Sequence, residues 1–198
     1  MSMERLRSEL TAFIGALYEG EKKVLVFGEG AADAPVMLVG EAPGEQESLM
    51  GRPFVGKAGK NLDEFLAGAG MERRELYVTN TVKFRPTKRS AAGRTVNRPP
   101  TQEEVKLFLP WLLKEIELVN PACVVTLGNV PLKALTDRSS VIGQMHGRFK
   151  DLGGRLLFPM YHPASVIYNP SLKAVYRQDL ALFAQWYEKY RESGIKDV

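Results

Sequence analysis

Three polar side chains of the 198-residue chain occupy positions where strand formation does not require them. Glu41, Asn80 and His162 each come directly after, or within two residues of, a short apolar run that has the character of a strand. A carboxylate, an amide and an imidazole are groups with which a protein stabilises charge and hydrogen-bonds a polar substrate. Each one alone also fits a structural role, as a helix N-terminal acid, a turn residue or a buried histidine. Together at one edge of a sheet they predict a functional site.

The elements that would position this trio alternate along the chain. Strands are expected at Pro35–Val39, Glu75–Thr79, Ala122–Leu127 and Arg155–Met160, which are short apolar runs bounded by turn residues. Helical periodicity marks Glu4–Tyr18, Lys57–Ala69, Thr101–Val119 and Leu172–Tyr190. The alternation predicts an α/β fold, a three-layer α/β/α sandwich with a central four-stranded parallel sheet. Because ligands bind beyond the carboxyl ends of parallel strands, the trio should share one rim of the sheet.

The composition is that of an ordinary soluble globular protein, with 44% hydrophobic and 25% charged residues. The length suits a single domain over residues 1–198. No run approaches the roughly 18 apolar residues of a membrane span. The charged segment Met1–Leu10 also lacks the apolar run of a signal peptide. We therefore expect a cytoplasmic protein with no membrane partner.

The one cysteine, Cys123, lies in the apolar run Ala122–Leu127. A single cysteine cannot form an internal disulfide, and it cannot hold a metal ion or a cluster by itself. We expect Cys123 to be a small buried residue of the core.

Positive charge is concentrated in one stretch of the chain, although the net charge is only +4. Residues 83–98 carry six cations and no acidic residue, namely Lys83, Arg85, Lys88, Arg89, Arg94 and Arg98. The loop Phe84–Pro100, which contains most of them, is long for a compact domain and therefore indicates a function. A solvated surface and a phosphate-binding surface both fit this pattern, and charge alone does not decide between them.

Four motifs around the trio give the chain a family resemblance. They are Gly40-Glu-Ala-Pro-Gly-Glu-Gln-Glu47, Gly51-Arg-Pro-Phe-Val-Gly-Lys-Ala-Gly59, Tyr77-Val-Thr-Asn80 and His162-Pro-Ala164. In this order they resemble the uracil-DNA glycosylase superfamily, and most of all its family 4, over Val26–Asn169. The resemblance implies a three-layer α/β/α fold and an enzyme of base excision repair. Such an enzyme is a monofunctional hydrolase that flips uracil out of DNA and cleaves its N-glycosidic bond, leaving an abasic site.

The resemblance also implies a role for each site residue. Phe54 would stack on the flipped uracil. Asn80 would accept a hydrogen bond from uracil N3–H and donate one to O4, a pattern that cytosine reverses. His162 would lie near uracil O2 and Glu41 near the attacked sugar carbon and its water, where they stabilise the two charges of the breaking bond. The residues expected to line the substrate site beside Glu41 are Gly40 and Ala42.

Two segments would contact uracil-containing DNA, the expected partner of what we predict to be a monomeric enzyme. The segment after His162 matches the family's intercalating loop and contains Ser165, Val166 and Ile167. Either Val166 or Ile167 would fill the hole that the flipped base leaves. The basic stretch would contact phosphates through Lys83, Arg85, Lys88, Arg89 and Arg94.

The chain departs from family 4 at the residues that bind a cofactor. Typical members hold a [4Fe–4S] cluster with four cysteines. Here Phe84 and Phe108 stand at two of those positions, and the cysteine pair expected near Phe13–Ala16 is absent. We therefore predict that the chain holds no cluster, no metal and no other cofactor, and that apolar packing replaces the cluster.

Other departures concern catalysis and DNA contact. Ser48 replaces a family acid, Tyr168 replaces an arginine of the intercalating loop, and Lys88–Val96 resembles an insertion. Relatives that crosslink to uracil carry a histidine in a similar extension, but Lys83–Pro100 has none, which favours turnover over covalent trapping.

Two functions other than a uracil-releasing enzyme also fit the sequence. One is a catalytically weak DNA-binding member of the superfamily that recognises deaminated or damaged bases. The retained Glu41, Asn80 and His162 favour the enzyme over this alternative. The other is a nucleotide-binding regulatory protein with a doubly wound fold. Its Gly-rich fingerprint is absent after the first strand, since Gly28-Glu-Gly30 precedes that strand.

Overall fold

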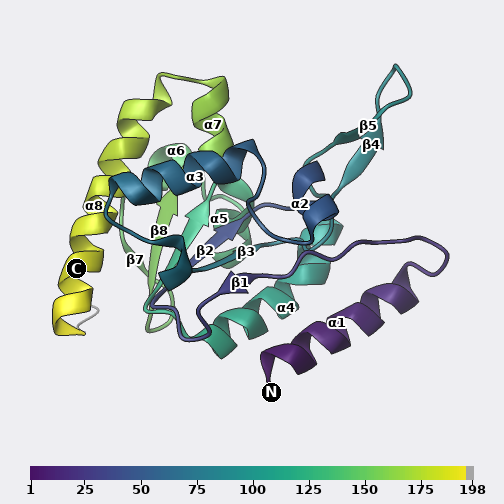
Figure 1. Cartoon of the computed structure of the whole chain (residues 1–198), viewed down its shortest axis with the longest axis horizontal. Helices are drawn as coiled ribbons and strands as arrows, with labels where there is room; N and C mark the ends of the chain where they lie inside the picture. Colours follow the sequence, from purple (N-terminus) through teal and green to yellow (C-terminus); the bar gives the residue numbers. More distant parts are fainter. Residues whose placement is uncertain (195–198) are drawn as a thin grey trace.

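The central sheet contains four parallel strands between two short antiparallel ones (Figure 1). The computed structural model describes residues 1–194, and its main sheet has the order β1-β3-β2-β6-β8-β7. The four parallel strands are β2 (Val36–Gly40), β3 (Tyr77–Asn80), β6 (Cys123–Leu127) and β8 (Leu156–Met160). The predicted α/β class and its four parallel strands are therefore confirmed.

The size of the sheet needs a correction, because the main sheet has six strands and not four. β1 (Glu29–Gly30) pairs with β3, and β7 (Lys150–Asp151) pairs with β8, both in antiparallel orientation. Each edge strand has only two residues. So short a segment forms neither an apolar run nor an alternation, and the sequence pattern therefore gave no sign of it.

The parallel strands lie inside the molecule, covered on both faces. Every residue of β2, β3 and β6 is buried, as expected for strands with helices on both sides. Successive side chains alternate between the faces, so Val36 and Leu38 pack on one side while Met37 and Val39 pack on the other. Cys123 of β6 is fully buried, as predicted.

Helices form the two outer layers of the sandwich (Figure 1). One face is covered by α3 (Lys57–Gly68), α7 (Pro163–Tyr168) and α8 (Leu172–Ser193). The other is covered by α4 (Gln102–Val119), α5 (Asn129–Leu135) and α6 (Ile142–Met145). The remaining helical segments are α1 (Met3–Leu17), which packs on α4, the short α2 (Glu45–Met50) and a 3-10 turn at Arg73–Glu75. Within residues 1–194, no helix combines the length and the apolar character that crossing a bilayer requires.

The boundaries of α4 follow from local signals in the sequence. The backbone N–H of Glu104 donates to Thr101 Oγ1 at 3.2 Å, and the backbone N–H of Thr101 donates to Glu104 Oε2 at 2.7 Å. This reciprocal pair is the predicted capping box. The helix ends where Asn120 adopts a left-handed conformation with φ 50°, which asparagine tolerates better than most residues.

The long loop predicted at Phe84–Pro100 contains a second, two-stranded sheet. β4 (Thr87–Arg89) and β5 (Thr95–Asn97) form an antiparallel hairpin that projects from the body of the molecule (Figure 1). Because Thr87 pairs with Asn97 and side chains alternate along a strand, Arg89 lies on the same face of the hairpin as Asn97. Lys88 lies on the opposite face.

A separate aromatic core lies between α1, α4 and the chain after β3. The Phe84 ring meets the rings of Tyr18 and Phe108 edge-on, at centroid distances of 5.6 Å and 5.4 Å. Ile14 of α1 is buried in the same cluster. The Lys23 ammonium group lies 4.6 Å from the centre of the Tyr18 ring, in cation–π contact. The three segments in which the family resemblance implies cysteines therefore meet around apolar side chains.

Candidate active site

A pocket of about 300 Å³ lies at the carboxyl ends of the parallel strands. Its wall includes four residues predicted for the substrate site, namely Ala42, Phe54, Asn80 and His162. It also includes Glu47 and Asn97, to which the sequence assigned no role. Gly40 and Glu41 come at the end of β2, next to this wall, but are not part of it. The structure thus brings the amide and the imidazole of the trio together, while Glu41 adjoins the pocket wall only along the chain, between Gly40 and Ala42.

Asn80 presents an unbonded amide to the pocket. It is only 3% exposed and stands at the end of β3, opposite Gly40 of β2. A Cβ atom on Gly40 would meet both Asn80 Oδ1 and the Phe54 ring, so the position needs glycine. No group in residues 1–194 hydrogen-bonds the amide, which keeps a free donor and a free acceptor. Amides this well buried normally have partners, so the free amide points to a ligand.

Phe54 adopts a strained backbone conformation that its surroundings hold in place. Its φ of 52° lies in the left-handed region, which costs a non-glycine residue about 1–3 kcal/mol. Arg73 donates to the carbonyls of Pro53 at 2.6 Å and Phe54 at 2.8 Å. Gly59 of α3 approaches so closely that a Cβ there would meet the Phe54 carbonyl. The Phe54 ring consequently stands 5.9 Å from the ring of His162, centroid to centroid.

Glu47 ties together the two loops that form the pocket wall. Its Oε1 accepts hydrogen bonds from the backbone N–H groups of Val55 at 3.0 Å and Gly56 at 2.7 Å. Its Oε2 accepts from the N–H of Gly44 at 3.1 Å, the residue before α2. The three-residue spacing from Gly44 was an available signal of this capping role. Arg73 gave no such signal, because its bonds to the carbonyls of Pro53 and Phe54 span about 20 residues of sequence.

His162 is a neutral hydrogen-bond donor in this arrangement. It precedes α7, and its Nδ1 accepts a hydrogen bond from the backbone N–H of Ala164 at 3.1 Å. Nδ1 therefore carries no proton, and the proton of the neutral ring is on Nε2. Burial lowers the pKa of His162 from 6.5 to about 4, against a weaker opposing effect of Glu47. At neutral pH the ring is uncharged and donates through Nε2–H.

Glu41 follows Gly40 at the end of β2 and precedes Ala42 of the pocket wall. Its backbone carbonyl accepts a hydrogen bond from the N–H of Val82 at 3.1 Å, which fixes the chain at the end of β2. Burial raises the pKa of Glu41 above 4.5. Within residues 1–194, its carboxylate has neither an ion-pair partner nor a hydrogen-bond donor. Glu41 is therefore free to stabilise charge or orient water, whereas both oxygens of Glu47 are engaged.

Lys83 does not reach the surface, so the prediction that it contacts DNA is wrong. Its side chain is 2% exposed, and its Nζ lies 2.5 Å from Oε2 of Glu115 in α4. The sequence shows the charge of Lys83 but not its burial, because Glu115 is 32 residues away.

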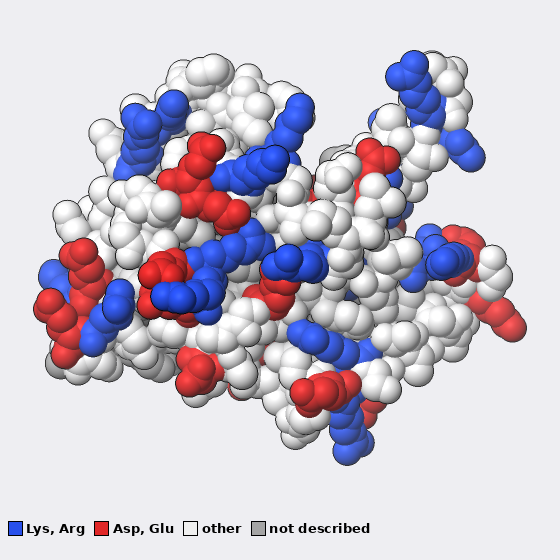
Figure 2. Space-filling view, in the orientation of Figure 1, with Lys and Arg blue, Asp and Glu red and all other residues white. Residues whose placement is uncertain are grey.

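Of the other cations predicted to contact DNA, one has an ion-pair partner in the protein and three have none among the described residues. Arg85 contacts Glu45 at 3.4 Å and Asn97 at 2.6 Å, at the base of the hairpin. Figure 2 shows Lys and Arg side chains gathered at the projecting end of the hairpin. The hairpin cations that are exposed, with no ion-pair partner in the described part of the chain, are Lys88, Arg89 and Arg94. They are the free cations of the hairpin, whose residue Asn97 is part of the pocket wall.

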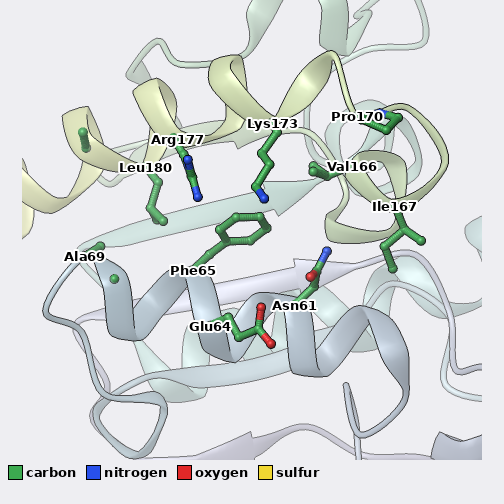
Figure 3. Close-up of a pocket in the computed structure, with 12 residues that line it drawn as sticks. Asn61, Glu64, Phe65, Ala69, Val166, Ile167, Pro170, Lys173, Arg177 and Leu180 are labelled. Carbon is green, nitrogen blue, oxygen red and sulfur yellow. The ribbon is translucent and has the colours of Figure 1, made fainter.

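α7 contains the predicted intercalating residues Ser165, Val166 and Ile167. Val166 is 7% exposed and packs in the core, so it cannot act as a wedge, whereas Ile167 is 44% exposed. Ile167 also borders a groove of about 800 Å³ between α3 and α8. In Figure 3, Lys173 and Arg177 of α8 point across this groove toward α3. α7 therefore borders both cavities, the pocket through Ala164 and the groove through Val166 and Ile167.

Comparisons with known proteins agree with one another. A family model described as the Uracil DNA glycosylase superfamily matches residues 27–189. The chain is 39% identical over 172 residues to a Type-4 uracil-DNA glycosylase of Pyrobaculum aerophilum, which covers 82% of this chain and 83% of that protein. It is 39% identical over 160 residues to a Type-4 uracil-DNA glycosylase of Thermotoga maritima, which covers 79% of each. The crystal structure of Pedobacter heparinus SMUG2 has a similar fold, with a TM-score of 0.54 at 13% identity over 96% of this chain and 85% of that chain.

An NMR titration should give His162 a midpoint near pH 4 instead of 6.5, with the proton of the neutral ring on Nε2. Because the pKa of His162 is lower in the folded protein, the unfolded chain binds more protons between pH 6.5 and pH 4. The contribution of His162 to the free energy of unfolding is therefore complete above pH 6.5 and is lost as the pH falls toward 4. His162→Gln should flatten the pH dependence of the free energy of unfolding in this range. His146→Gln assigns the signals, since His146 is the other of the two histidines. A midpoint near 6.5 for His162 would contradict the neutral-donor arrangement.

Proposed function

Because the chain belongs to the uracil-DNA glycosylase superfamily, we propose that its pocket takes a uracil flipped out of DNA and that the enzyme hydrolyses the N-glycosidic bond. The product is DNA with an abasic site and free uracil. One observation carries the proposal: the unbonded Asn80 amide faces a pocket whose wall also holds the Phe54 ring and the neutral His162. A planar base with polar edges fits this set of groups.

Asn80 and Phe54 would recognise the base by hydrogen bonding and stacking. The amide of Asn80 accepts from uracil N3–H and donates to O4. Phe54 restores part of the stacking lost on flipping, worth about 1–3 kcal/mol. Cytosine has an amino group in place of O4 and no hydrogen on N3, so donor would face donor and acceptor would face acceptor. Leaving buried polar groups unpaired makes rejection of cytosine strong.

His162 and Glu41 would stabilise the two charges that develop as the bond breaks. The electron pair of the N-glycosidic bond leaves with uracil, and Nε2–H of His162 donates to the anionic base. Positive charge develops on the sugar, where the Glu41 carboxylate stabilises it and orients water. The water oxygen bonds to C1′ of the sugar, and its proton is released toward Glu41 and solvent. One donor aimed at developing charge is worth about 100- to 1000-fold in rate.

Ile167 and the hairpin would hold the DNA around the flipped nucleotide. Ile167 is exposed on α7, in the helix that directly follows His162, and has the apolar character of a wedge. Lys88, Arg89 and Arg94 would contact phosphates on the hairpin side of the pocket. Arg89 lies on the hairpin face that also carries Asn97, a residue of the pocket wall.

The residues present do not fit an iron–sulfur cluster, although the chain is similar to Type-4 enzymes. Such a cluster needs four thiolates, and the chain has one cysteine, which is buried in β6. The segments that would converge on a cluster instead contribute Ile14, Phe84 and Phe108, whose side chains pack together. We propose that this apolar cluster replaces the cofactor, and no step of the reaction is assigned to a metal.

The purified protein should be colourless and should work without iron. It should lack the visible absorbance of an iron–sulfur cluster, and a chelator should change neither its unfolding midpoint nor its rate of uracil release. Iron and absorbance are measured after desalting, with a Type-4 enzyme that contains cysteines as the positive control. Stoichiometric iron that survives desalting and rises and falls with activity would overturn the prediction.

The proposed function is tested with oligonucleotides that carry one uracil, incubated with protein and then cleaved with alkali. Strand cleavage at the uracil position is expected, and an identical oligonucleotide with thymine should stay intact. Binding to the uracil strand without alkali-sensitive product would instead support the catalytically weak DNA-binding alternative.

Asn80→Asp should reduce uracil release by roughly 100-fold or more, because an ionised carboxylate has no donor for O4 and repels it. The same carboxylate accepts from cytosine N4–H₂, so a weak release of cytosine should appear. It stays weak because a paired cytosine costs more to flip. Single-turnover rates on matched uracil and cytosine oligonucleotides measure both effects. Asn120→Asp, at the other end of the sheet, is the matched control. Wild-type uracil rates in Asn80→Asp would refute the assignment of this pocket.

Neutralising the hairpin cations should weaken DNA binding to a similar degree for all sequences. We expect Lys88→Gln, Arg89→Gln and Arg94→Gln in combination to flatten the plot of log affinity against log salt, by a slope of roughly 1 for each true phosphate contact. The control replaces Lys150, Lys189 and Arg191, which lie at β7 and the end of α8, away from the hairpin (Figure 1). An unchanged slope in the hairpin variant would show that these cations are only solvated.

A further inference from the structure

We propose that Lys83 is a positioning residue for base recognition, because its ammonium group holds the backbone of Asn80 from the side of the sheet opposite the pocket. This inference rests on the proposed function, in which the Asn80 amide recognises uracil. Lys83 is buried and is not part of the pocket wall. It therefore acts through Asn80 and not on the substrate.

Three oxygen atoms surround the Lys83 ammonium group. Nζ donates to Thr79 Oγ1 at 2.6 Å, to the backbone carbonyl of Asn80 at 2.7 Å and to Glu115 Oε2 at 2.5 Å. An ammonium group has three N–H donors, so all of them are used. Hydrogen bonds from a charged donor are roughly twice as strong as neutral ones. The Asn80 carbonyl is thus held firmly at the point where β3 ends.

Glu115 connects this ammonium group to the rest of the fold. Its Oε1 accepts from the Tyr77 hydroxyl at 2.9 Å, and its Oε2 accepts from the Thr79 hydroxyl at 3.1 Å. Burial, together with the Glu115 carboxylate, raises the pKa of Tyr77, so its hydroxyl keeps its proton and donates. Gly28 closes the site, since a Cβ there would meet both Tyr77 and Glu115. The network therefore joins β3, α4 and the segment before β1.

The network and the pocket lie on opposite faces of β3. Tyr77 and Thr79 bond to Glu115 of α4, whereas Val78 packs in the core on the α3 side. Because side chains alternate, Asn80 projects to the same face as Val78. Lys83 thus holds the Asn80 carbonyl from the α4 side, while the amide projects into the pocket on the other side.

Stability alone does not account for a buried ion pair at this place. Two well-packed apolar side chains of similar volume often stabilise a core as well or better. An apolar pair cannot, however, donate a hydrogen bond to the Asn80 carbonyl. Without that bond, the residue that carries the base-recognising amide loses its fixed orientation. A misplacement of about 1 Å in an active site can reduce the rate roughly 100-fold.

The test uses the double variant Lys83→Met/Glu115→Leu, which removes both charges and leaves neither one unpaired. We expect a folded protein with a lower unfolding midpoint, because the buried hydroxyls of Tyr77 and Thr79 lose their Glu115 partner. Its maximal single-turnover rate of uracil release should fall at least 10-fold, while its affinity for the thymine-containing control DNA stays unchanged. The NMR signals of the Asn80 side-chain amide should broaden or shift, because the amide is no longer held in one orientation.

Leu112→Ala provides a control for stability. Leu112 is fully buried on the same helix as Glu115 and has no hydrogen bond to Asn80. The variant should lower the unfolding midpoint but keep the wild-type rate for each folded molecule, with an unchanged Asn80 amide signal. A loss of rate in this control equal to that of the double variant would overturn the role of Lys83.

If the double variant does not fold, a single variant of Lys83 tests the same inference. Lys83→Gln leaves Glu115 with a neutral donor, and its rate for each folded molecule should also fall, with a changed Asn80 amide signal. Wild-type rate and wild-type amide signals in a folded Lys83 variant would refute the inference. The wild type is assayed first, so failure of the wild type to release uracil refutes the proposed function and is distinguishable from failure of this inference.

Discussion

The pairing of β2 with β3 is the interaction on which the pocket depends. Its register sets Gly40 opposite Asn80, and the absence of a side chain at Gly40 allows the Asn80 amide and the Phe54 ring to lie side by side. A shift of one residue would turn Asn80 to the other face of the sheet and bring Thr79 toward the pocket. Burial of the apolar residues on both faces of β2 and β3 fixes this register. The core therefore determines which polar groups are present at the rim.

Charged side chains then hold the loops at this rim by bonding to backbone groups. Glu47 accepts from three backbone N–H groups, Arg73 donates to two carbonyls, and Lys83 donates to one. Loops at strand ends lack regular pairing, so their N–H and C=O groups need other partners. Charged partners form stronger bonds than neutral ones. These bonds allow Phe54 to remain in a left-handed conformation that it would not adopt in a free loop.

The sequence predicted the main strands and the residues at their ends better than the short strands and the buried side-chain interactions. Continuous apolar runs revealed the four parallel strands, and residues at strand ends led to Asn80 and His162. The hairpin and the edge strands were missed because strands of two or three residues show no periodicity. Lys83 was assigned to the surface because composition reveals charge but not burial. For the predicted wedge the sequence leaves Val166 and Ile167 as alternatives, and of these two only Ile167 is exposed in the fold.

The projecting hairpin has a consequence for how such an enzyme changes over evolutionary time. Its strand pairs are internal to residues 87–97, and its base is held by the contact of Arg85 with Asn97. Insertions or deletions at the tip therefore leave the register of the main sheet and the pocket wall unaltered. Mutations can therefore change the length or the net charge of the hairpin tip while the main sheet and the pocket wall stay the same. Under the proposed contact of the hairpin with DNA, preference for different DNA structures would then diversify separately from the choice of base.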